Sequence, residues 1–596
     1  MNRLGKWLRS HGEVKRHTAA RTLIPVVSAE TYVSSSGWPY LSEPAYLHLR
    51  DHVPQLFSHG HLAWEGMEHL ERLVGGSSGF PDLELHHFQA SSNVVKQVLR
   101  TAAITAPPSL WLARHVLSQL VESGFAERLL NQEAICPSNE QGIRGPELEM
   151  DLTFLSILGL VQRSQGVFSL EENAVRAFEL PALPNGLPVA MAEVWRRVFE
   201  GGAISEPEEL AVEWVLSPPK PLPPMERSQW NPNVEEIELG HRLLPLVLGL
   251  ASAQRIPRIL ERGELHEEAL GGGREFRAGL QGLFRAGGLL EVESTTLTPL
   301  GVRVLERGPG PFGIIEAYHP YMSQLGRILE QGRGAVHVAR GSNVAASQRA
   351  NRASFSHAND RLDAFCQDTG WSYGVFIEHA LGRGEATRQR YERDGDSLNY
   401  LGADLEDEAI DAACEQQRLG RLPPKMEFVR NADIGDARAL LEPLSRCARS
   451  GEGVVMVVGN GFHEIRDQGD EAMIQVLKSY CEAGIVLLFT EETALSIEDQ
   501  KSTAWNTYHP AFRYVHEKSG QGLRPTLEPG TPRDDDPMPM SWTECARRAG
   551  YTLLDAYTRR GRTIYPCPQE SGRNPSTSVI YFFVPTTLAG KLGLVS

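Results

Sequence analysis

The chain has 596 residues, of which 41% are hydrophobic and 22% are charged, and its formal net charge is −16. This composition is that of an ordinary globular protein with about three or four domains. The negative charge repels a phosphate backbone, and no apolar run approaches the ~20 residues of a membrane helix, so neither a nucleic acid nor a membrane is an expected partner.

The N-terminal segment is basic but lacks the long apolar core and the cleavage site of a signal peptide. The seven cysteines are scattered, odd in number and without a CxxC pair. Reduced thiols fit this usage better than a disulfide framework or a cysteine zinc site. We therefore expect a cytoplasmic protein.

Two segments before residue 310, Leu148–Phe178 and Arg274–Leu305, share one pattern. Each has a helical apolar period, a glycine near the helix end, a short alternating run and the start of another helix, which is the outline of a winged helix. DNA recognition by the second helix is one interpretation. The acidity of the chain and the lack of a Lys/Arg-rich helix favour a packing, homodimerising or lid module instead.

Proline-rich and glycine-rich stretches predict the domain boundaries. The stretch Ser217–Asn233 reads as a linker, because prolines favour extended backbone and donate no ladder hydrogen bonds. A second junction lies near Gly332–Asn343, and Leu527–Met540 reads as an exposed loop. The predicted parts are a helical, winged-helix-like domain (1–216), the linker (217–233), a second winged-helix-like domain with a helical connector (234–340) and a C-terminal domain (341–596).

The C-terminal domain alternates apolar runs with helical stretches. The runs are GWSYGVFIEHA, LNYLGADLE, MEFVRNADIG, GVVMVVGN, GIVLLFTEE and TSVIYFFVP. Near-continuous apolar strands between helices predict an α/β fold with a parallel, Rossmann-like sheet buried on both faces. Ligands of such sheets bind beyond the carboxyl ends of the strands, so the residues that follow each run are candidate site residues.

After the first run, Glu378, Ala380, Gly382 and Gly384 occupy the positions of an acidic-x-Gly-x-Gly-x-Gly loop, with alanine in the first glycine slot. Glycines in such a loop let a nucleotide approach the backbone closely. An ordinary turn is the alternative, because Gly-x-Gly also occurs in turns without a ligand.

Acidic residues follow the second and third runs. Asp404, with Leu405 after it, lies twenty residues beyond Gly384, where a carboxylate can bind ribose hydroxyls; a helix N-cap is the alternative. Asp433, followed by Ile434, is placed to meet an adenine amino group. Because no Walker-type Gly-Lys-Ser/Thr occurs, the pattern predicts a nucleoside ligand without a triphosphate, which suggests S-adenosylmethionine.

The fourth run ends in Gly459, Asn460 and Gly461, and His463 follows at once. The two residues Gly459 and Asn460 are expected beside the cofactor. His463 is then either a site residue just beyond the strand end or the polar end of a buried strand, and we expect a catalytic role for it.

The region after the fifth run, TAWNTYHPAFRYVHEKSGQGLRP, combines His509, His516 and Arg513 with several aromatic residues. It reads either as a pocket for an anionic substrate or as an aromatic-rich packed helix with a basic face. His463 and His509, with Gln468 as an oxygen ligand, would suit Fe(II) or Mn(II), since two neutral imidazoles and one oxygen leave coordination positions open.

These stretches resemble the metal-dependent S-adenosylmethionine methyltransferase modules in the loading regions of polyketide synthases of the apratoxin and saxitoxin type. The resemblance spans about Ala350 to Pro525 and includes the last apolar run. It rests on ANRASFSHANDRLDAFCQDTGW, FIEHALGRGEATRQRY, GADLEDEAIDAA, VRNADIGDA, VGNGFHEIRDQGDE, FTEE and TAWNTYHPAFRYVHEKSGQGLRP. More distantly, GNGFHEIRDQGDEAMIQVLKSYCEAG is similar to the segment of small-molecule O-methyltransferases whose histidine, at the position of His463, is the general base.

The resemblance implies a class I methyltransferase fold that binds S-adenosylmethionine. It implies C-methylation of a malonyl thioester on an acyl carrier protein, assisted by iron or manganese acting as a Lewis acid. Among His463, Gln468 and His509, the first is the best ligand candidate, and His463, His509 and Arg513 are the catalytic candidates. No carrier or decarboxylase domain is recognisable, so a carrier protein must act in trans or the substrate is a small-molecule acid.

Two alternatives remain at this level. One is an O- or N-methyltransferase of a free small molecule in which His463 is the general base and no metal takes part. The other is a winged-helix regulator that senses a nucleoside through its C-terminal domain.

Overall fold

The computed structural model describes the chain with short gaps. The residues described are 2–34, 37–53, 57–184, 191–217, 230–336, 341–447, 452–466, 468–526, 538–569 and 572–594, and side chains are described outside 341–350. The chain forms two compact units. The first unit holds residues 1–337, 497–515 and 563–574, and the second holds 338–496, 516–562 and 575–596.

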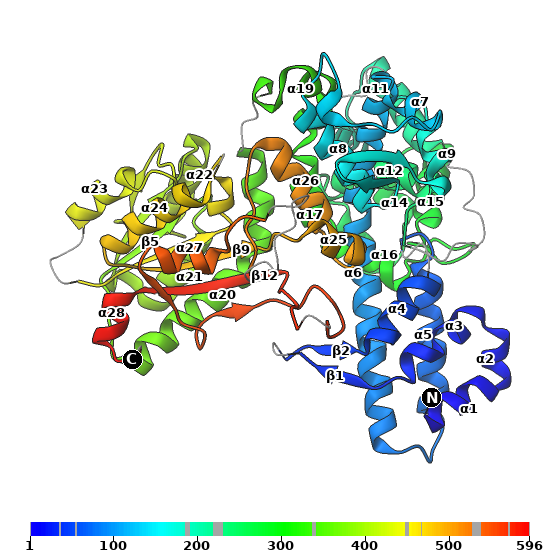
Figure 1. Cartoon of the computed structure of the whole chain (residues 1–596), viewed down its shortest axis with the longest axis horizontal. Coiled ribbons are helices and arrows are strands. Elements are labelled where there is room, and N and C mark those ends of the chain that lie inside the picture. The colour runs from blue at the N-terminus through cyan, green and yellow to red at the C-terminus, as the bar shows by residue number, and fades with distance from the viewer. Residues whose placement is uncertain are drawn as a thin grey trace. The chain divides into compact units, whose positions relative to one another are not determined.

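The second unit is built on one mixed sheet with the strand order β10-β12-β9-β8-β5-β6-β7 (Figure 1). Strands β5 to β9 are mutually parallel, as the apolar runs predict, so the expected α/β, Rossmann-like class is confirmed for this region. The strands are β5 (Val375–His379), β6 (Asn399–Ala403), β7 (Glu427–Val429), β8 (Val454–Gly459), β9 (Ile485–Glu492), β10 (Tyr551–Leu553), β11 (Arg559–Arg560) and β12 (Ser578–Pro585).

Strand β12 departs from the predicted parallel sheet. It pairs antiparallel with both β9 and β10, with Tyr581 opposite Phe489 and Thr552 opposite Val584. The described part of the connection from β10 to β12 contains no helix, and an antiparallel return needs no crossover helix, whereas a parallel one does. The reversed strand β12 therefore lies between β9 and the edge strand β10, which both run in the direction of the other strands.

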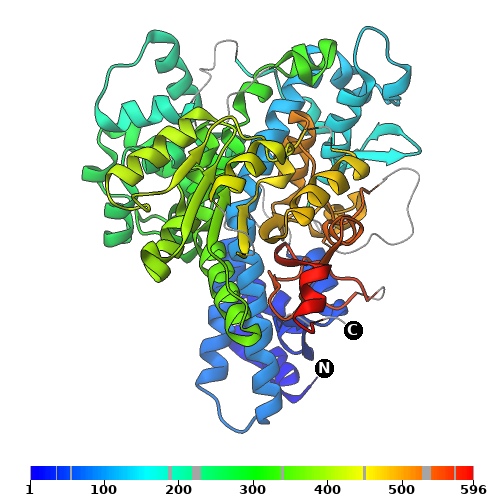
Figure 2. The same ribbon diagram turned by 90° about the vertical axis from the view of Figure 1, so that its left-hand side faces the viewer.

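Helices cover both faces of this sheet (Figure 2). One core cluster joins the strands to α23, α24 and α27, and the other joins them to α20, α21, α22 and α28. Alternate strand residues enter opposite clusters, such as Ile377 and Phe376, since side chains alternate across a strand. The helices are α20 (Gly341–Thr369), α21 (Glu385–Asp394), α22 (Asp407–Arg418), α23 (Arg438–Cys447), α24 (Asp470–Glu482), α27 (Trp542–Arg548) and α28 (Thr586–Lys591).

The first unit is mainly helical, and two long helices, α6 and α12, pack against each other at its centre. The buried pair Arg114–Glu238 joins them, with 1% and 13% of the two side chains exposed. The helices are α1 (Arg3–Ser10), α2 (Gly12–Arg16), α3 (Thr18–Val27), α4 (Glu43–His52), α5 (Gly60–Gly75), α6 (Asp82–Glu122), α7 (Phe125–Leu130), α8 (Gly145–Ile157), α9 (Val175–Phe178), α10 (Met191–Glu200), α11 (Glu206–Leu216), α12 (Val234–Ser252), α13 (Ile256–Arg262), α14 (Glu267–Leu270), α15 (Arg274–Ala286), α16 (Pro299–Arg307), α17 (Pro309–Glu316), α18 (His319–Met322), α19 (Leu325–Gln331) and α25 (Ile497–Thr503), and α26 (His509–Ser519) begins in this unit.

Both segments predicted to be winged-helix-like have the expected local order. In the first, α8 leads into an antiparallel hairpin of β3 (Val161–Ser164) and β4 (Val167–Leu170), followed by α9. In the second, α15 leads into a bridge between Leu290 and Leu297, and α16 follows. A further two-stranded sheet pairs β1 (Thr31–Val33) with β2 (Pro39–Leu41). The function of the two segments and the predicted boundaries at 216, 233 and 340 stay predictions.

Parts of all three predicted linkers and loops lie outside the described residues, namely 218–229, 337–340 and 527–537. In the part of the chain that the structure describes, no single helix is long and apolar enough to cross a membrane. Only α12 and α13 taken together pass that test, and they are bent by 96° relative to each other.

Candidate cofactor site and catalytic histidine

A cavity of about 350 Å³ lies at the carboxyl ends of β5, β6, β7 and β8, where the sequence places a ligand site. Eight of the ten predicted cofactor residues line it: Ala380, Gly382, Asp404, Leu405, Asp433, Ile434, Gly459 and Asn460. The others in its wall are Asn351, Phe355, His379, Glu406, Ala432, Gly461, Glu464, Ile465 and Arg466. The structure thus brings four separate strand ends to one site.

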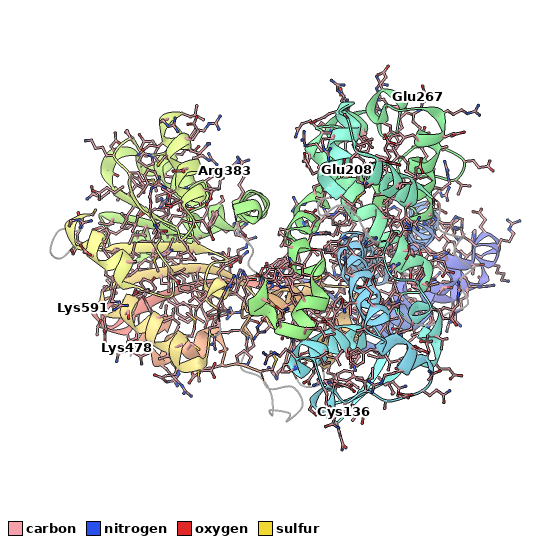
Figure 3. All side chains as sticks on the ribbon, turned by 90° about the horizontal axis from the view of Figure 1, so that it is seen from above. Cys136, Glu208, Glu267, Arg383, Lys478 and Lys591 are labelled. Carbon is pink, nitrogen blue, oxygen red and sulfur yellow. The ribbon has the colours of Figure 1, made fainter. Side chains whose placement is uncertain are left out.

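The loop after β5 has the backbone that its glycines predict. Gly382 and Gly384 have φ of +53° and +77°, in the left-handed region where a side chain is strained. Ala380, in the first glycine slot, also has a positive φ of +56°. A Cβ on Gly384 would come within 2.9 Å of Leu422, so close packing requires that glycine, although it does not line the cavity. The side chain of Arg383, between the glycines, is exposed (Figure 3).

Glu378 has a different role from the one predicted. Its carboxylate is 1% exposed, does not line the cavity, and accepts hydrogen bonds from the backbone N–H groups of Ala386 and Thr387 at 3.2 and 2.7 Å. Burial raises the pKa of Glu378 to about 7. The residue therefore holds the first turn of α21 against the end of β5 and supports the loop instead of binding the ligand itself.

Asp404 lines the cavity and lies just before α22, whose N-cap is Glu406, so the N-cap alternative is wrong and ribose binding stays a prediction. Its carboxylate accepts hydrogen bonds from the N–H groups of Gly382 at 2.9 Å and Glu406 at 3.0 Å, so it fixes the loop and the entry to α22. Burial raises its pKa. Each carboxylate oxygen has a second lone pair, so Asp404 can still accept from a ligand hydroxyl. Leu405 is 43% exposed, which leaves an apolar face in the cavity wall.

The end of β8 and the residue after it are closely packed against α20. A Cβ on Gly459 would lie 2.4 Å from the ring of Phe355, so only glycine fits there. The Nδ2 group of Asn460, whose φ is +53°, donates to Asn351 Oδ1 at 3.2 Å. The α20 residues were missed because helix α20 is far from the strand ends in sequence. The other cavity-lining residues that the sequence analysis did not name lie within seven positions of a predicted cofactor residue. They could have been predicted from their closeness to the strand ends.

His463 lies in a 3-10 turn, Phe462–Glu464, directly after β8. The sequence predicts that a helix follows it at once, but α24 begins only at Asp470, behind an N-cap at Gly469. His463 is 7% exposed. Its Nδ1 lies 2.8 Å from Glu491 Oε2, and its Nε2 lies 3.4 Å from Glu464 Oε1. The ring of His516 packs edge-on against it at 4.8 Å between centroids. His463 therefore belongs to a cluster of contacting polar side chains, and it is more than the polar residue that follows a buried strand.

Glu491, at the end of β9, was not singled out from the sequence. Its side chain is fully buried, and its Oε1 accepts from the N–H groups of Phe462 and His463 at 2.9 and 3.2 Å. Its other oxygen orients the imidazole, which is how a carboxylate fixes the tautomer of a catalytic histidine. The apolar run that ends in Glu-Glu is the sequence signal that could have found it.

The two carboxylates decide the charge of His463. Burial alone lowers the pKa of this imidazole, but Glu491 and Glu464 outweigh burial and raise the pKa to about 10. These two carboxylates favour the imidazolium form of the ring near neutral pH. Both nitrogens then carry protons, and Nε2 can accept a proton only after it has released one.

The stability of the fold should depend on this pair. Because the pKa of His463 in the folded protein, about 10, lies above the ordinary 6.5, its stabilisation is complete below about pH 6.5 and is lost as pH rises through about 10. Glu491→Gln removes the main attraction and lowers that pKa. Between pH 7 and 10 we expect wild type to lose about 2–4 kcal/mol more unfolding free energy than the variant.

Urea unfolding at several pH values measures this difference. Glu482→Gln is the matched control, because that carboxylate is exposed and pairs only loosely with Lys478 at 3.8 Å. Parallel pH profiles for wild type and Glu491→Gln would contradict the assignment.

The structure does not support the predicted metal site. The Nε2 group of Gln468 donates to the carbonyls of Phe462, Ile465 and Gly522, and its Oε1 accepts from Arg524, so both ends of the amide are hydrogen-bonded within the protein. His463 lies between the carboxylates of Glu491 and Glu464, at 2.8 and 3.4 Å. Within the ranges described above, no group of three His, Cys, Asp or Glu side chains is arranged to hold a metal ion. The predicted site for Fe(II) or Mn(II) is therefore not supported.

His509 and Arg513 begin helix α26 and belong to the first unit, whereas His463 belongs to the second. His509 is 1% exposed. In the same unit Tyr514 stacks on Phe154 and donates to Asp151 at 2.7 Å, as in a packed aromatic helix. The catalytic roles of His509 and Arg513 stay predictions.

No known protein-family profile and no curated protein matches the sequence. Among solved structures, the chain is similar to the carbon methyltransferase CurJ, with 11% identity, a TM-score of 0.32 and coverage of 83% of this chain and 97% of that one. The DszA carbon methyltransferase has 11% identity, a TM-score of 0.31 and coverage of 80% and 89%. The O-methyltransferase NcsB1 of neocarzinostatin biosynthesis has 15% identity, a TM-score of 0.32 and coverage of 56% and 92%. These values carry no argument about activity, so function is argued from the site.

Proposed function

We propose that this chain is an S-adenosylmethionine-dependent methyltransferase of natural-product biosynthesis. The main observation behind this proposal is the negative charge of the cavity at the strand ends. Four carboxylates, Asp404, Glu406, Asp433 and Glu464, line it with a single guanidinium, Arg466. Such a wall attracts a cationic nucleoside and repels the pyrophosphate of a dinucleotide or the triphosphate of ATP. The sulfonium of S-adenosylmethionine meets this requirement.

The sheet supports the same proposal. Strands β5 to β9 follow the strand order of a Rossmann fold, and the reversed strand β12 lies beside β9. That insertion is the arrangement expected of the class I methyltransferase fold, which the sequence motifs resemble. The adenosine part would lie over the ends of β6 and β7, where Asp404 can accept from ribose hydroxyls and Leu405 and Ile434 present apolar surface.

His463 and Glu491 would supply the base. Once Nε2 of His463 is deprotonated, it can take a proton from the acceptor while Glu491 holds the proton on Nδ1. The electron pair left on the acceptor then forms the bond to the methyl carbon. The carbon–sulfur bond breaks towards sulfur, and neutral S-adenosylhomocysteine leaves. The protein aligns the acceptor and the methyl group and excludes water.

The pKa of His463 indicates which kind of methyl acceptor it could deprotonate. A histidine whose pKa stands at about 10 suits a weak acid, since proton transfer is most efficient when donor and base are matched. A carbon next to a thioester carbonyl, or a phenol, is such an acid, whereas a neutral amine needs no base to attack a methyl sulfonium. We propose C-methylation of a malonyl-type thioester on a carrier protein acting in trans, and O-methylation of a small-molecule acid as the second candidate.

Mass spectrometry tests the proposal directly. The full-length protein, with S-adenosylmethionine, is offered a malonyl-loaded carrier protein and a panel of free hydroxy acids. A gain of methyl units on the carrier-bound acyl group supports the first acceptor, and a gain on a hydroxy acid supports the second. No transfer to any acceptor, together with no binding of S-adenosylmethionine, would refute the methyltransferase proposal.

Metal removal is a further prediction. Because the base mechanism uses only residues of the chain, we expect a protein treated with EDTA and desalted to keep methyl-transfer activity within about twofold of the untreated protein. Added Fe(II) or Mn(II) should not raise it. Loss of activity on chelation that returns with one of these ions would contradict the metal-free base mechanism.

A further inference from the structure

The first 27 residues form a basic region on an acidic chain. They contain six lysine or arginine residues and one glutamate, whereas the formal net charge of the whole chain is −16. These residues fold into α1, α2 and α3, which pack with α4 and α5 in the first unit (Figure 1). The methyl-transfer chemistry proposed for the second unit makes no use of this positive charge.

A groove of about 430 Å³ is lined by residues of α1, α2, α3 and α4. Arg9, Lys15 and Arg21 bring three positive charges to its wall. His48 and His52 add two imidazole rings, which stack with their centroids 4.0 Å apart. The other described residues of the wall are uncharged, so the groove attracts anions.

The three cations of this groove are available to an external partner. All three side chains are exposed, and among the described residues no carboxylate forms an ion pair with Arg9, Lys15 or Arg21. Glu13, the single carboxylate of the basic region, lies 4.0 Å from a histidine of α5. Like charges that share one groove repel each other, and an anionic partner would remove this repulsion.

The surroundings of the groove favour one kind of anionic partner. Leu4 and Leu8 of α1 are fully buried in the unit, so this helix has no free apolar face to insert into a membrane. A duplex nucleic acid is a long polyanion, and the net charge of −16 repels it. A protein surface with a few carboxylates matches both the size and the charge of the groove.

We propose that the groove formed by Arg9, Lys15 and Arg21 is the docking surface for the acidic face of the carrier protein that brings the acyl acceptor in trans. Carboxylates of the carrier pair with the three cations. Because these charges are exposed, the contact speeds encounter and selects the partner more than it adds affinity. The inference rests on the proposed methyltransferase function and its carrier-bound acceptor.

Steady-state methyl transfer to two acceptors tests the docking surface. The full-length protein is offered a malonyl group either on an acyl carrier protein of net negative charge or on N-acetylcysteamine, which forms the same thioester without a protein. In Arg21→Glu we expect kcat/KM for the carrier-bound acceptor to fall by about tenfold, through KM, because a favourable charge becomes a repulsive one. For the small thioester kcat/KM should stay within about twofold, because that acceptor needs no docking surface.

Two further measurements bear on the same charges. Lys15→Gln removes one charge without reversing it, so its loss with the carrier-bound acceptor should be smaller, about threefold. Raising the NaCl concentration from about 50 to about 300 mM should lower kcat/KM for the carrier-bound acceptor, and less so in Arg21→Glu, since salt screens exposed charges.

Arg258→Glu is the matched control. Arg258 is an exposed arginine of α13 in the same unit, and it lies outside the groove. The charge change is the same as in Arg21→Glu, so wild-type kinetics are expected with both acceptors. Thermal unfolding of every variant shows whether the first unit is folded, and turnover of the small thioester shows whether the second unit is active.

The outcomes separate the two proposals. Equal losses with both acceptors in Arg21→Glu, or no loss with the carrier-bound one, overturn the docking surface and leave the methyltransferase proposal standing. Methyl transfer to free hydroxy acids alone overturns it too, as does tighter binding of duplex DNA or of phosphatidylserine vesicles than of the carrier protein. If S-adenosylmethionine does not bind and no acceptor is methylated, the proposed function fails as well.

Discussion

His463→Ala should lower kcat/KM for methyl transfer by about 10³-fold, within the 10²–10⁴ range of positioned acid–base groups, while S-adenosylmethionine still binds. The loss follows because His463 is the imidazole held by Glu491 at 2.8 Å. The cofactor cavity is lined by its neighbour Glu464 and not by His463 itself, so affinity should stay within about threefold. Single-turnover methyl transfer and calorimetric binding measure the two effects.

His357→Ala is the matched control for this experiment. His357 is a 37% exposed histidine of α20 in the same unit, paired loosely with Asp360 at 3.9 Å. It should keep wild-type turnover. His463→Gln checks the fold, because its amide can still donate to the buried Glu491, whereas alanine leaves that carboxylate without the imidazolium. Retained turnover in a folded His463→Ala protein would refute the catalytic assignment.

Gly382→Trp should abolish binding of S-adenosylmethionine, with a loss of affinity greater than about 100-fold. Gly382 lines the cavity, and its N–H donates to Asp404 at 2.9 Å. An indole there would occupy space in a cavity of about 350 Å³. Its φ of +53° adds backbone strain of about 1–3 kcal/mol, which lowers stability without removing the core. Calorimetry gives the affinity, and circular dichroism with thermal unfolding gives the state of the fold.

Gly395→Trp separates strain from cavity filling. Gly395 has a similar φ of +57° and follows α21, and no atom lies within 4 Å of the position that a Cβ would take there. It should show the same loss of stability with wild-type affinity. Unchanged affinity in Gly382→Trp would mean that the cofactor does not use this cavity.

The sequence predicted strands β5 to β9 and β12 of the second unit, because each is a short apolar run bounded by polar residues, but it did not predict β10 and β11. It also predicted which strand ends would meet, since parallel strands bring their carboxyl ends to one edge. The reversal of β12 was not predictable from its composition, because an apolar run reads the same in either direction. The delayed start of α24 was missed because polar residues such as Gln468 and Asp470 fit a helix and a turn alike.

The residues around His463 were harder to predict. Gln468 was expected to be a metal ligand from its spacing, but spacing along the chain does not show that three carbonyls and Arg524 already use its amide. His509 was paired with His463 because both follow strands; the two residues belong to different units, so that pairing stays a prediction. Glu491 was missed because its role depends on contacts with Phe462 and His463, which follow the neighbouring strand β8 and are distant in sequence.

The sequence by itself determined the Rossmann-like sheet, the glycine-containing loop after β5 and the places of Asp404, Asp433 and His463 after strand ends, because apolar periodicity and glycine placement are local properties of the chain. Only the tertiary structure decided what those residues do. Glu378 became a support for α21, Asp404 joined the loop to α22, and the two carboxylates Glu464 and Glu491 enclosed His463. The physical reason is that hydrogen bonding and charge depend on distance in space and on burial, and neither follows from separation in sequence.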